Sequence, residues 1–381
     1  MSSDMVDVIG RLAPTPSGRM HLGNIMAMMA AWMSARSQGG RVLLRIEDLD
    51  RAHVVRDADR WIMDDLEWLG IDWDADPVYQ SDRDGLYGKA LKAVESADSG
   101  VDPGVYPCWC SRSDIRAASA PQEGDGFVVY PGTCRRLAME HPDEVRARLR
   151  TRAQHSLRLA MPGSMPPTTP DATPDATSDA TSGAMPGCVD PPRDVVDVHD
   201  RVFGDVRYSL SRDVGDSVIR RADGVFSYQL AVVVDDLTMG VTDVVRGRDL
   251  LRSTALQMEI RRRLEAAFYA GADIGGPVTD GAPAWNPRYA HLPLVDGSGG
   301  RRLAKRERSL DMGALRAAGA TPDQVVGYCA WLLGIRAEGT SDRPVPLSCA
   351  QACRLFSWKD VAASLDDRML PKDVVEVIRH L

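Results

Sequence analysis

Residues 6–69 alternate between short apolar runs and longer segments of helical pattern. Residues 6–12 and 41–46 are typical of buried strands, and residues 24–37 and 57–69 are typical of helices that end at glycine. Strands and helices joined by short links form a parallel sheet, because each helix carries the chain back in a right-handed crossover. The ligand crevice of such a sheet lies beyond the carboxyl ends of its strands. The sequence therefore predicts an α/β fold whose chemistry lies just after the first strand.

Composition divides the chain into four parts. Residues 1–100 and 201–262 are predicted to form two halves of a nucleotide-binding domain, separated by a cysteine-bearing insertion over 101–200. Inside the insertion, residues 161–193 are rich in Pro and Gly and repeat an Asp-Ala-Thr unit, a composition that cannot bury a core. We expect a disordered surface segment there. Residues 263–381 are predicted to be a helical region, and the apolar run before residue 238 is either a central strand or a buried helix.

The charge balance excludes a global attraction to nucleic acid. The chain carries 46 Lys+Arg against 54 Asp+Glu, a net charge of −8, so a polyanionic partner must be met by local arginines. The longest apolar run, Ile25 to Ala35, is about half of the roughly 20 residues that a membrane span needs. Asp4 and Asp7 stand where a signal peptide would be basic. We expect a cytoplasmic protein with no membrane partner.

The segment between the first strand and the first helix is the richest in chemical signals. It runs Arg-Leu-Ala-Pro-Thr-Pro-Ser-Gly-Arg-Met-His-Leu-Gly-Asn from Arg11 to Asn24. Its prolines stiffen the turn, and Gly23 allows a close approach of backbone to a ligand. Amides at a helix start favour phosphate, to which His21 can donate a hydrogen bond. The alternative is an ordinary strand–helix turn with a surface histidine, but the full stretch favours a phosphate site.

Three further segments carry charges that suit an amino acid or a phosphate. Glu47 stands near the carboxyl end of the second strand, where it suits an ammonium group unless the segment is a solvated turn. Arg246 and Arg248 flank a glycine and could hold a carboxylate, or form salt bridges at a strand edge. Tyr228 brings a hydroxyl into the apolar run. In residues 299–308, two glycines precede a basic cluster. This pattern indicates either a mobile loop whose charges reach polyphosphate or a basic segment exposed to solvent.

The seven cysteines are odd in number and unevenly spread, which argues against a disulfide framework. Cys108, Cys110 and Cys134, with Tyr130, could close a tetrahedral structural zinc site. The alternative is two stray cysteines and one free cysteine. The remaining cysteines are expected to be small buried apolar residues: Cys188, Cys329, Cys349 and Cys353.

In their order along the chain these motifs resemble the glutamyl branch of the class I aminoacyl-tRNA synthetases. The resemblance covers about residues 1–160 and 195–310. It implies a doubly wound parallel-sheet (Rossmann-like) catalytic domain with a zinc-bearing insertion and a small C-terminal helical region. The enzymes of this branch are ligases that use ATP. The matching segments are 11–24, 45–50, 228–236, 244–247 and the second signature 302–306.

The resemblance also assigns roles to single residues. L-Glutamate would be bound by Arg11, Leu12, Ala13, Pro14, Thr15, Glu47, Tyr228 and Arg246, with Glu47 on its α-ammonium group. ATP would be bound by His21, Gly23, Asn24 and Lys305, of which His21 and Lys305 are catalytic. One structural Zn²⁺ would be bound by Cys108, Cys110, Tyr130 and Cys134, and Mg²⁺ would accompany ATP. The chain departs from the pattern at Asn24, which replaces a second histidine, and at Arg302 and Ala304, which replace lysine and serine. Loss of the serine hydroxyl predicts slower activation.

The cysteine–tyrosine pattern and the absence of a C-terminal anticodon-binding region resemble the short members of the branch. Those enzymes attach glutamate to the queuosine base in the anticodon of tRNA(Asp). The resemblance thus implies a monomer whose partners are L-glutamate, ATP and the tRNA(Asp) anticodon loop. Candidates for contacts with RNA phosphates are Arg135, Arg136, Arg301 and Arg302.

Three other functions remain open at this point. A truncated glutamyl-tRNA synthetase would charge a tRNA 3′ end, but only about 75 residues follow the second signature, too few for two anticodon-binding bundles. An inactive paralogue would act as an RNA-binding module, against which the intact Arg11, Glu47, Arg246 and Lys305 argue. An adenylyltransferase with a small acceptor would leave the cysteine cluster unexplained.

Overall fold

The computed structural model describes residues 7–96, 103–118, 127–163, 194–274, 286–297, 311–337 and 342–381. Their largest sheet has seven strands in the order β3-β2-β1-β9-β10-β6-β7. All neighbouring strands are parallel except β6 and β7, which pair antiparallel. The strands are β1 (Ile9–Leu12), β2 (Arg41–Ile46), β3 (Val78–Tyr79), β6 (Val195–Asp200), β7 (Gly204–Ser209), β9 (Asp243–Gly247) and β10 (Arg288–Leu292). The predicted parallel α/β sheet is confirmed, and the order of its strands reverses between β1 and β9.

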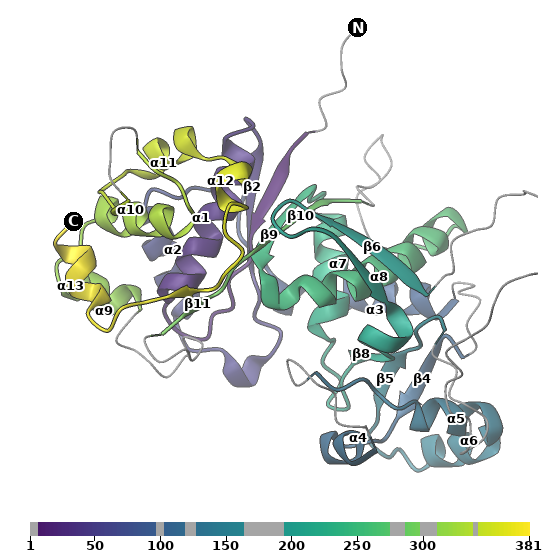
Figure 1. Ribbon diagram of the computed structural model, residues 1–381. Coiled ribbons are helices and arrows are strands. Elements are labelled where there is room, and N and C mark those ends of the chain that lie inside the picture. Colours follow the sequence, from purple (N-terminus) through teal and green to yellow (C-terminus); the bar gives the residue numbers. More distant parts are fainter. Residues whose placement is uncertain are drawn as a thin grey trace, which may run out of the picture.

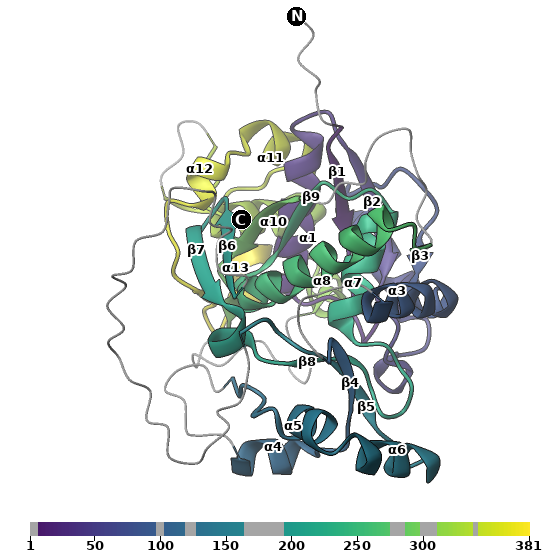
Figure 2. The ribbon, with the colours of Figure 1, turned by 90° about the vertical axis from the view of Figure 1, so that its right-hand side faces the viewer.

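Helices cover both faces of this sheet (Figures 1 and 2). One face carries α1 (Leu22–Arg36) and α2 (Ala58–Trp68), and the other carries α3 (Asp84–Ser96), α7 (Tyr228–Thr238) and α8 (Leu251–Tyr269). The two layers form separate hydrophobic clusters. The apolar run that begins at Tyr228 is therefore a buried helix. Single helical turns lie at Arg51–His53, Gln80–Asp82, Leu210–Val214 and Arg248–Leu250.

The C-terminal helices bury the outer side of α1. Helix α1 is apolar on nearly all sides, and a helix of this kind must be covered all round. The covering elements belong to the same hydrophobic cluster as α1. They are α9 (Met312–Ala317), α10 (Pro322–Leu332), α11 (Cys349–Leu355), α12 (Trp358–Val361) and α13 (Val374–Arg379). Strand β12 (Arg368–Met369) ties this layer to β11 (Val295–Asp296).

The insertion forms a module at one end of the molecule, at the bottom of Figures 1 and 2. Its three-stranded antiparallel sheet has the order β4-β5-β8 and carries three helices. These elements are β4 (Val105–Cys108), β5 (Ser156–Leu159), β8 (Ser217–Arg220), α4 (Arg112–Ala118), α5 (Thr133–Glu140) and α6 (Pro142–Arg150).

The structure corrects the predicted domain boundaries. Strand β6 belongs to the main sheet although it was placed in the insertion, and β8 belongs to the insertion sheet although it was placed after residue 200. The helical region predicted over 263–381 contains helices α9 to α13, but it also contributes strand β10 to the main sheet. Most of the low-complexity segment, residues 164–193, lies outside the described residues.

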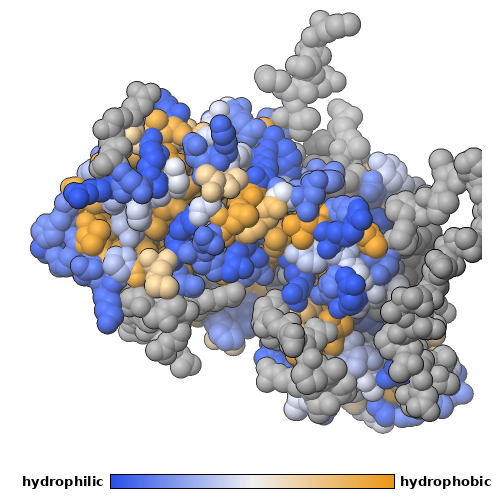
Figure 3. Space-filling model, in the orientation of Figure 1, coloured by the Kyte–Doolittle hydropathy of each residue, from blue (hydrophilic) through white to orange (hydrophobic). Residues whose placement is uncertain are grey.

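Hydrophilic residues cover most of the face shown in Figure 3, with apolar residues in separate patches among them. No helix within the described ranges is long and apolar enough to cross a membrane.

Candidate active site

A cavity of about 440 Å³ lies at the carboxyl ends of β1, β2 and β9. Ligands of an open α/β sheet bind at this edge, where the strand order reverses. The cavity brings together residues that the sequence predicted from separate motifs: Arg11, Ala13, Thr15, His21, Gly23, Asn24, Glu47, Tyr228 and Arg246.

Three predicted residues are not among the residues that line this cavity in the described part of the chain. Leu12 is fully buried in the core beside α1, so its side chain does not line the cavity. Pro14 lines an adjoining cavity instead. Lys305, with the whole second signature, lies outside the described residues.

Arg246 is held only by neutral acceptors. Its Nε donates to His291 Nε2 at 3.1 Å, and its Nη2 donates to Thr254 Oγ1 at 2.8 Å and to Gln257 Oε1 at 2.7 Å. Its Nη1 is buried and has no hydrogen-bond partner among the described residues. A cationic nitrogen in this state is satisfied best by an anion, above all by a carboxylate.

Two other arginines near the cavity, Arg45 and Arg11, share one carboxylate from α7. Arg45 Nη1 lies 2.5 Å from Asp236 Oδ1, and Arg11 Nε lies 3.5 Å from the same oxygen. Burial alone would raise the pKa of Asp236, but Arg45 and Arg11 hold it below its ordinary value. Arg11 lines the cavity, Arg45 is fully buried, and the end of α7 supports both.

Glu47 is oriented by the same network. Arg45 Nη2 lies 3.1 Å from Glu47 Oε1, and the Glu47 side chain is 10% exposed. Burial raises the pKa of Glu47 above its ordinary value, against the opposing attraction of Arg45 and Arg11. An ammonium group bound beside this carboxylate would favour its ionised form. The geometry thus suits the predicted contact with an amine.

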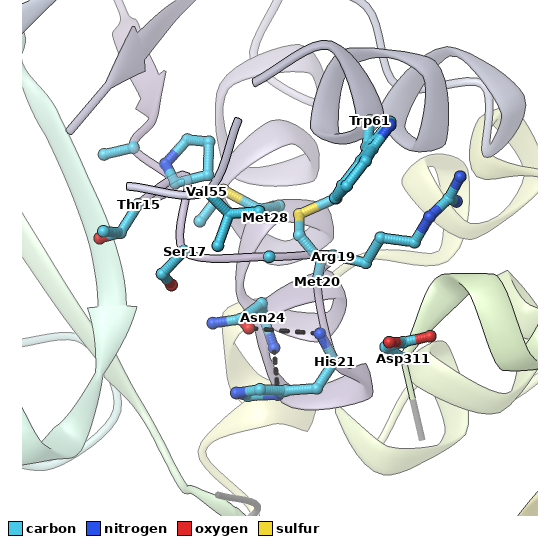
Figure 4. Close-up of a pocket in the computed structure, with 13 residues that line it drawn as sticks. Thr15, Ser17, Arg19, Met20, His21, Asn24, Met28, Val55, Trp61 and Asp311 are labelled. Atoms are coloured by element: carbon cyan, nitrogen blue, oxygen red, sulfur yellow. Dashed lines mark hydrogen bonds between the residues drawn. The ribbon is translucent and has the colours of Figure 1, made fainter. Parts of the chain in front are cut away.

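His21 begins α1 as a capping residue (Figure 4). The backbone N–H of Asn24 donates to His21 Nδ1 at 3.3 Å, and the His21 N–H donates to Asn24 Oδ1 at 3.4 Å. Because Nδ1 accepts a hydrogen bond, the proton of the neutral ring is on Nε2. His21 is therefore fixed as a donor through Nε2, and Asn24 replaces the second histidine of the motif as its capping partner.

Gly23 is required by the histidine ring. A Cβ atom at this position would lie 3.2 Å from His21 Cε1, 3.3 Å from His21 Nδ1 and 3.4 Å from Val295 Cβ. The sequence attributes this glycine to a close approach of ligand; it lines the central cavity, and a Cβ atom there would also crowd the His21 ring.

Gly23→Ala is expected to slow ATP–pyrophosphate exchange by about tenfold or more, because a displaced His21 loses part of its contact with phosphate. The thermal stability should not fall, since alanine favours helix over glycine by about 1 kcal/mol. Gly88→Ala in α3 is the matched control, because a Cβ there meets nothing within 4 Å. Equal exchange rates in the two variants would contradict the role given to Gly23.

Two further cavities adjoin the first. One, of about 490 Å³, lies between the β1–α1 connection, Trp61 and Asp311, and shares His21 and Asn24 with the central cavity (Figure 4). The other, of about 510 Å³, shares Glu47 and Tyr228 with it and is bordered by the insertion. Thr15 lines all three, so the arrangement offers room for several reactants around one residue.

The predicted metal ligands also come together. The Sγ atoms of Cys108, Cys110 and Cys134 lie within 4.8 Å of one another, with 3.5 Å between those of Cys110 and Cys134. The Tyr130 hydroxyl lies 3.4 Å from Cys108 Sγ and 3.5 Å from Cys110 Sγ. Four ligands at about 2.3 Å from one zinc would place sulfur atoms about 3.8 Å apart, so the cluster fits a tetrahedral site.

Arg158 supports this cluster and was not found by sequence reasoning. Its Nε donates to Cys108 Sγ at 3.2 Å, and its guanidinium carbon lies 3.8 Å from the Tyr130 ring centre. Hydrogen bonding from Cys134, aided by Tyr130 and Arg158, lowers the pKa of Cys108 to about 4. A nearby cation offsets the negative charge that several thiolates bring.

Protein purified without a chelator is expected to contain about one zinc per chain, and Cys110→Ser to lose it. The variant should unfold more readily, while its KM for the amino acid stays unchanged. Cys353→Ser, outside the cluster, serves as the control and should keep its metal. Elemental analysis that finds no zinc in the unaltered protein would exclude the site.

One predicted nucleic-acid contact is wrong. Arg135 was a candidate for RNA phosphates, but it is 2% exposed and its Nη1 lies 3.4 Å from Asp216 Oδ1. Arg136 is partly exposed on α5. Arg301 and Arg302 lie outside the described residues.

The chain belongs to the class I tRNA synthetases. The sequence model of the family described as "tRNA synthetases class I (E and Q), catalytic domain" matches residues 7–176 and 189–271.

Relatives narrow the resemblance to one branch of that family. The chain is 39% identical over 351 residues to the glutamyl-Q tRNA(Asp) synthetase of Symbiobacterium thermophilum, covering 89% of this chain and 90% of the relative. It is 37% identical over 358 residues to the protein of the same name from Geobacter sulfurreducens, covering 94% and 92%. The glutamate-tRNA synthetase of Elizabethkingia anophelis has a similar fold, with a TM-score of 0.70 at 21% identity, over 98% of this chain and 70% of that one.

Proposed function

We propose that this protein activates L-glutamate with ATP and transfers the glutamyl group to the queuosine base in the anticodon of tRNA(Asp). The observation that supports it most is the charge pattern of the central cavity. Among the described residues, Arg246 Nη1 has no hydrogen-bond partner and Arg246 pairs with no carboxylate, and Glu47 lines the same cavity. Glutamate carries two carboxylates and one ammonium group, so a carboxylate complements Arg246 and the ammonium group complements Glu47. The acceptor follows from the names of the relatives.

Glutamate binds in one orientation. Its side-chain carboxylate contacts Arg246, Arg11 and the hydroxyl of Tyr228, and its ammonium group contacts Glu47. The α-carboxylate then points toward Thr15, which lines all three cavities.

Activation needs no protein nucleophile. An oxygen of the α-carboxylate attacks the α-phosphorus of ATP, and the bond to pyrophosphate breaks. His21 donates from Nε2 to a phosphoryl oxygen, and Lys305 of the second signature contacts the same phosphates. Mg²⁺ bound with ATP supplies further charge neutralisation on the phosphates.

Transfer follows from the mixed anhydride. A hydroxyl of the RNA attacks the glutamyl carbonyl carbon, AMP leaves, and the hydroxyl proton passes to the AMP phosphate. The cavity beside the insertion takes the acceptor nucleoside, since it shares Glu47 and Tyr228 with the glutamate cavity. Bases of single-stranded loops can be splayed out into such a site. Cys108, Cys110, Tyr130 and Cys134 would hold a zinc ion, which would stabilise the wall of this cavity.

Charging with radiolabelled glutamate tests the proposal. We expect label on tRNA(Asp) that contains queuosine, and none on tRNA(Asp) that lacks it or on tRNA(Glu). Label on tRNA(Glu) would indicate charging of a 3′ end. Absence of both charging and pyrophosphate exchange would indicate an inactive RNA-binding paralogue.

A further inference from the structure

Arg246 donates a hydrogen bond to a histidine, His291, that has no role in the proposed reaction. His291 on β10 is fully buried, and its Nδ1 lies 2.6 Å from Asp200 Oδ2 on β6. Its Nε2 lies 3.1 Å from Arg246 Nε on β9. The three side chains thus connect three neighbouring strands of the main sheet to the glutamate cavity.

The hydrogen bonds fix the state of the ring. An arginine Nε–H can only donate, so His291 Nε2 must accept, and the ring proton is on Nδ1, where it is donated to Asp200. Burial lowers the pKa of His291 to about 4, with Arg246 and Arg11 acting in the same direction and Asp200 against it. The ring is therefore neutral near neutral pH. Asp200 is itself anchored, because its Oδ1 accepts the N–H groups of Val202 and Phe203, each at 2.9 Å.

Arg246 is held by uncharged groups, whereas Arg11 and Arg45 lie beside carboxylates. Arg45 and Arg11 lie 2.5 Å and 3.5 Å from the carboxylate of Asp236, and Arg45 also pairs with Glu47. In the described part of the chain, Arg246 donates hydrogen bonds to His291, Thr254 and Gln257, all uncharged, and the imidazole ring separates it from the carboxylate of Asp200.

We infer that His291, oriented by Asp200, is a positioning and specificity-determining residue: it aligns Arg246 while leaving its positive charge to the side-chain carboxylate of the substrate. A carboxylate in place of the ring would compete with the substrate, and an apolar residue would release Nε. This inference rests on the proposed binding of glutamate, and it extends to discrimination against glutamine, whose carboxamide carries no charge.

Two substitutions remove, by different routes, the hydrogen bond that His291 Nε2 accepts from Arg246. His291→Leu fills a similar volume but accepts no hydrogen bond. Asp200→Asn keeps its Oδ1 on the backbone N–H groups and turns an amide N–H toward His291 Nδ1, which moves the ring proton to Nε2, against the N–H of Arg246. In both we expect the KM for glutamate in pyrophosphate exchange to rise by about 10- to 100-fold, with the KM for ATP unchanged. The preference for glutamate over glutamine should fall by a similar factor.

His291→Gln is the conservative variant, because its amide oxygen can accept from Arg246 Nε, and it should keep the KM for glutamate within about threefold. Val198→Ala in β6 is the structural control, since Val198 is fully buried in the core and does not line the glutamate cavity. It should lower the melting temperature without changing either KM. If His291→Leu and Asp200→Asn behave like Val198→Ala, the inference is wrong. If the unaltered protein shows no glutamate-dependent exchange, the proposed function fails instead.

Discussion

Arg246→Ala is expected to abolish glutamate-dependent ATP–pyrophosphate exchange at ordinary glutamate concentrations, while ATP still binds. The unaltered protein should catalyse this exchange with glutamate alone, without RNA. Removing the guanidinium leaves the substrate carboxylate unpaired in a largely buried cavity, a loss of about 2–5 kcal/mol. Because three neutral acceptors hold Arg246 in a fixed plane, Arg246→Lys should not restore the activity.

Arg248→Ala is the matched control for this prediction. Arg248 follows Arg246 by two residues, but it pairs with Asp367 and does not line the glutamate cavity. Its loss should leave the KM for glutamate unchanged. An unchanged KM in Arg246→Ala as well would place the amino-acid site elsewhere.

Asp236→Asn is expected to lower the free energy of unfolding by about 3–5 kcal/mol, the second large effect. Asp236 is 4% exposed and neutralises Arg45, which is fully buried, and Arg11. Without the charge of Asp236, the buried guanidinium groups of Arg45 and Arg11 lose a carboxylate that they share. Asp197→Asn is the control, because its ion pair with Arg207 is exposed to solvent and its loss should leave the free energy of unfolding almost unchanged.

The stabilising effect of Asp236 should depend on pH in one direction. The pKa of Asp236 is lowered in the folded protein, so its stabilising effect is complete above the unfolded value of about 3.9 and is lost as the pH falls toward the folded value. Urea unfolding should therefore give a constant difference between the two proteins from pH 5 to pH 8 and a smaller one below about pH 4. A difference that grows as the pH falls would contradict this role.

Local patterns in the sequence predicted much of the fold. The first two strands and helices lie within a few residues of their predicted ranges, because the strands are short apolar runs and glycines follow both helices. Strand β10 was missed because it contains Arg288 and His291, which interrupt the apolar pattern of a central strand. Arg288 stays exposed and pairs with Asp243, and the burial of His291 depends on a partner far along the chain, Asp200.

The site was predictable where residue type alone indicates chemistry. Glu47, Arg246 and the cysteine cluster are examples, and the structure brings each beside its expected neighbours. The supporting residues were not predictable in the same way. A buried arginine such as Arg135 cannot be told from a surface one by sequence, and a lone histidine such as His291 is usually a core residue. Only the fold brings His291 next to Arg246 and Asp216 next to Arg135.

The acceptor is the central claim, and the location of the label on the RNA tests it most directly. tRNA(Asp) containing queuosine is charged with radiolabelled glutamate, digested with a base-specific nuclease, and the fragments are separated. Periodate cannot replace this step, because it destroys both the 3′-terminal diol and the queuosine diol. We predict that the label is recovered on the anticodon fragment. Label recovered on the 3′-terminal adenosine would contradict the proposed function.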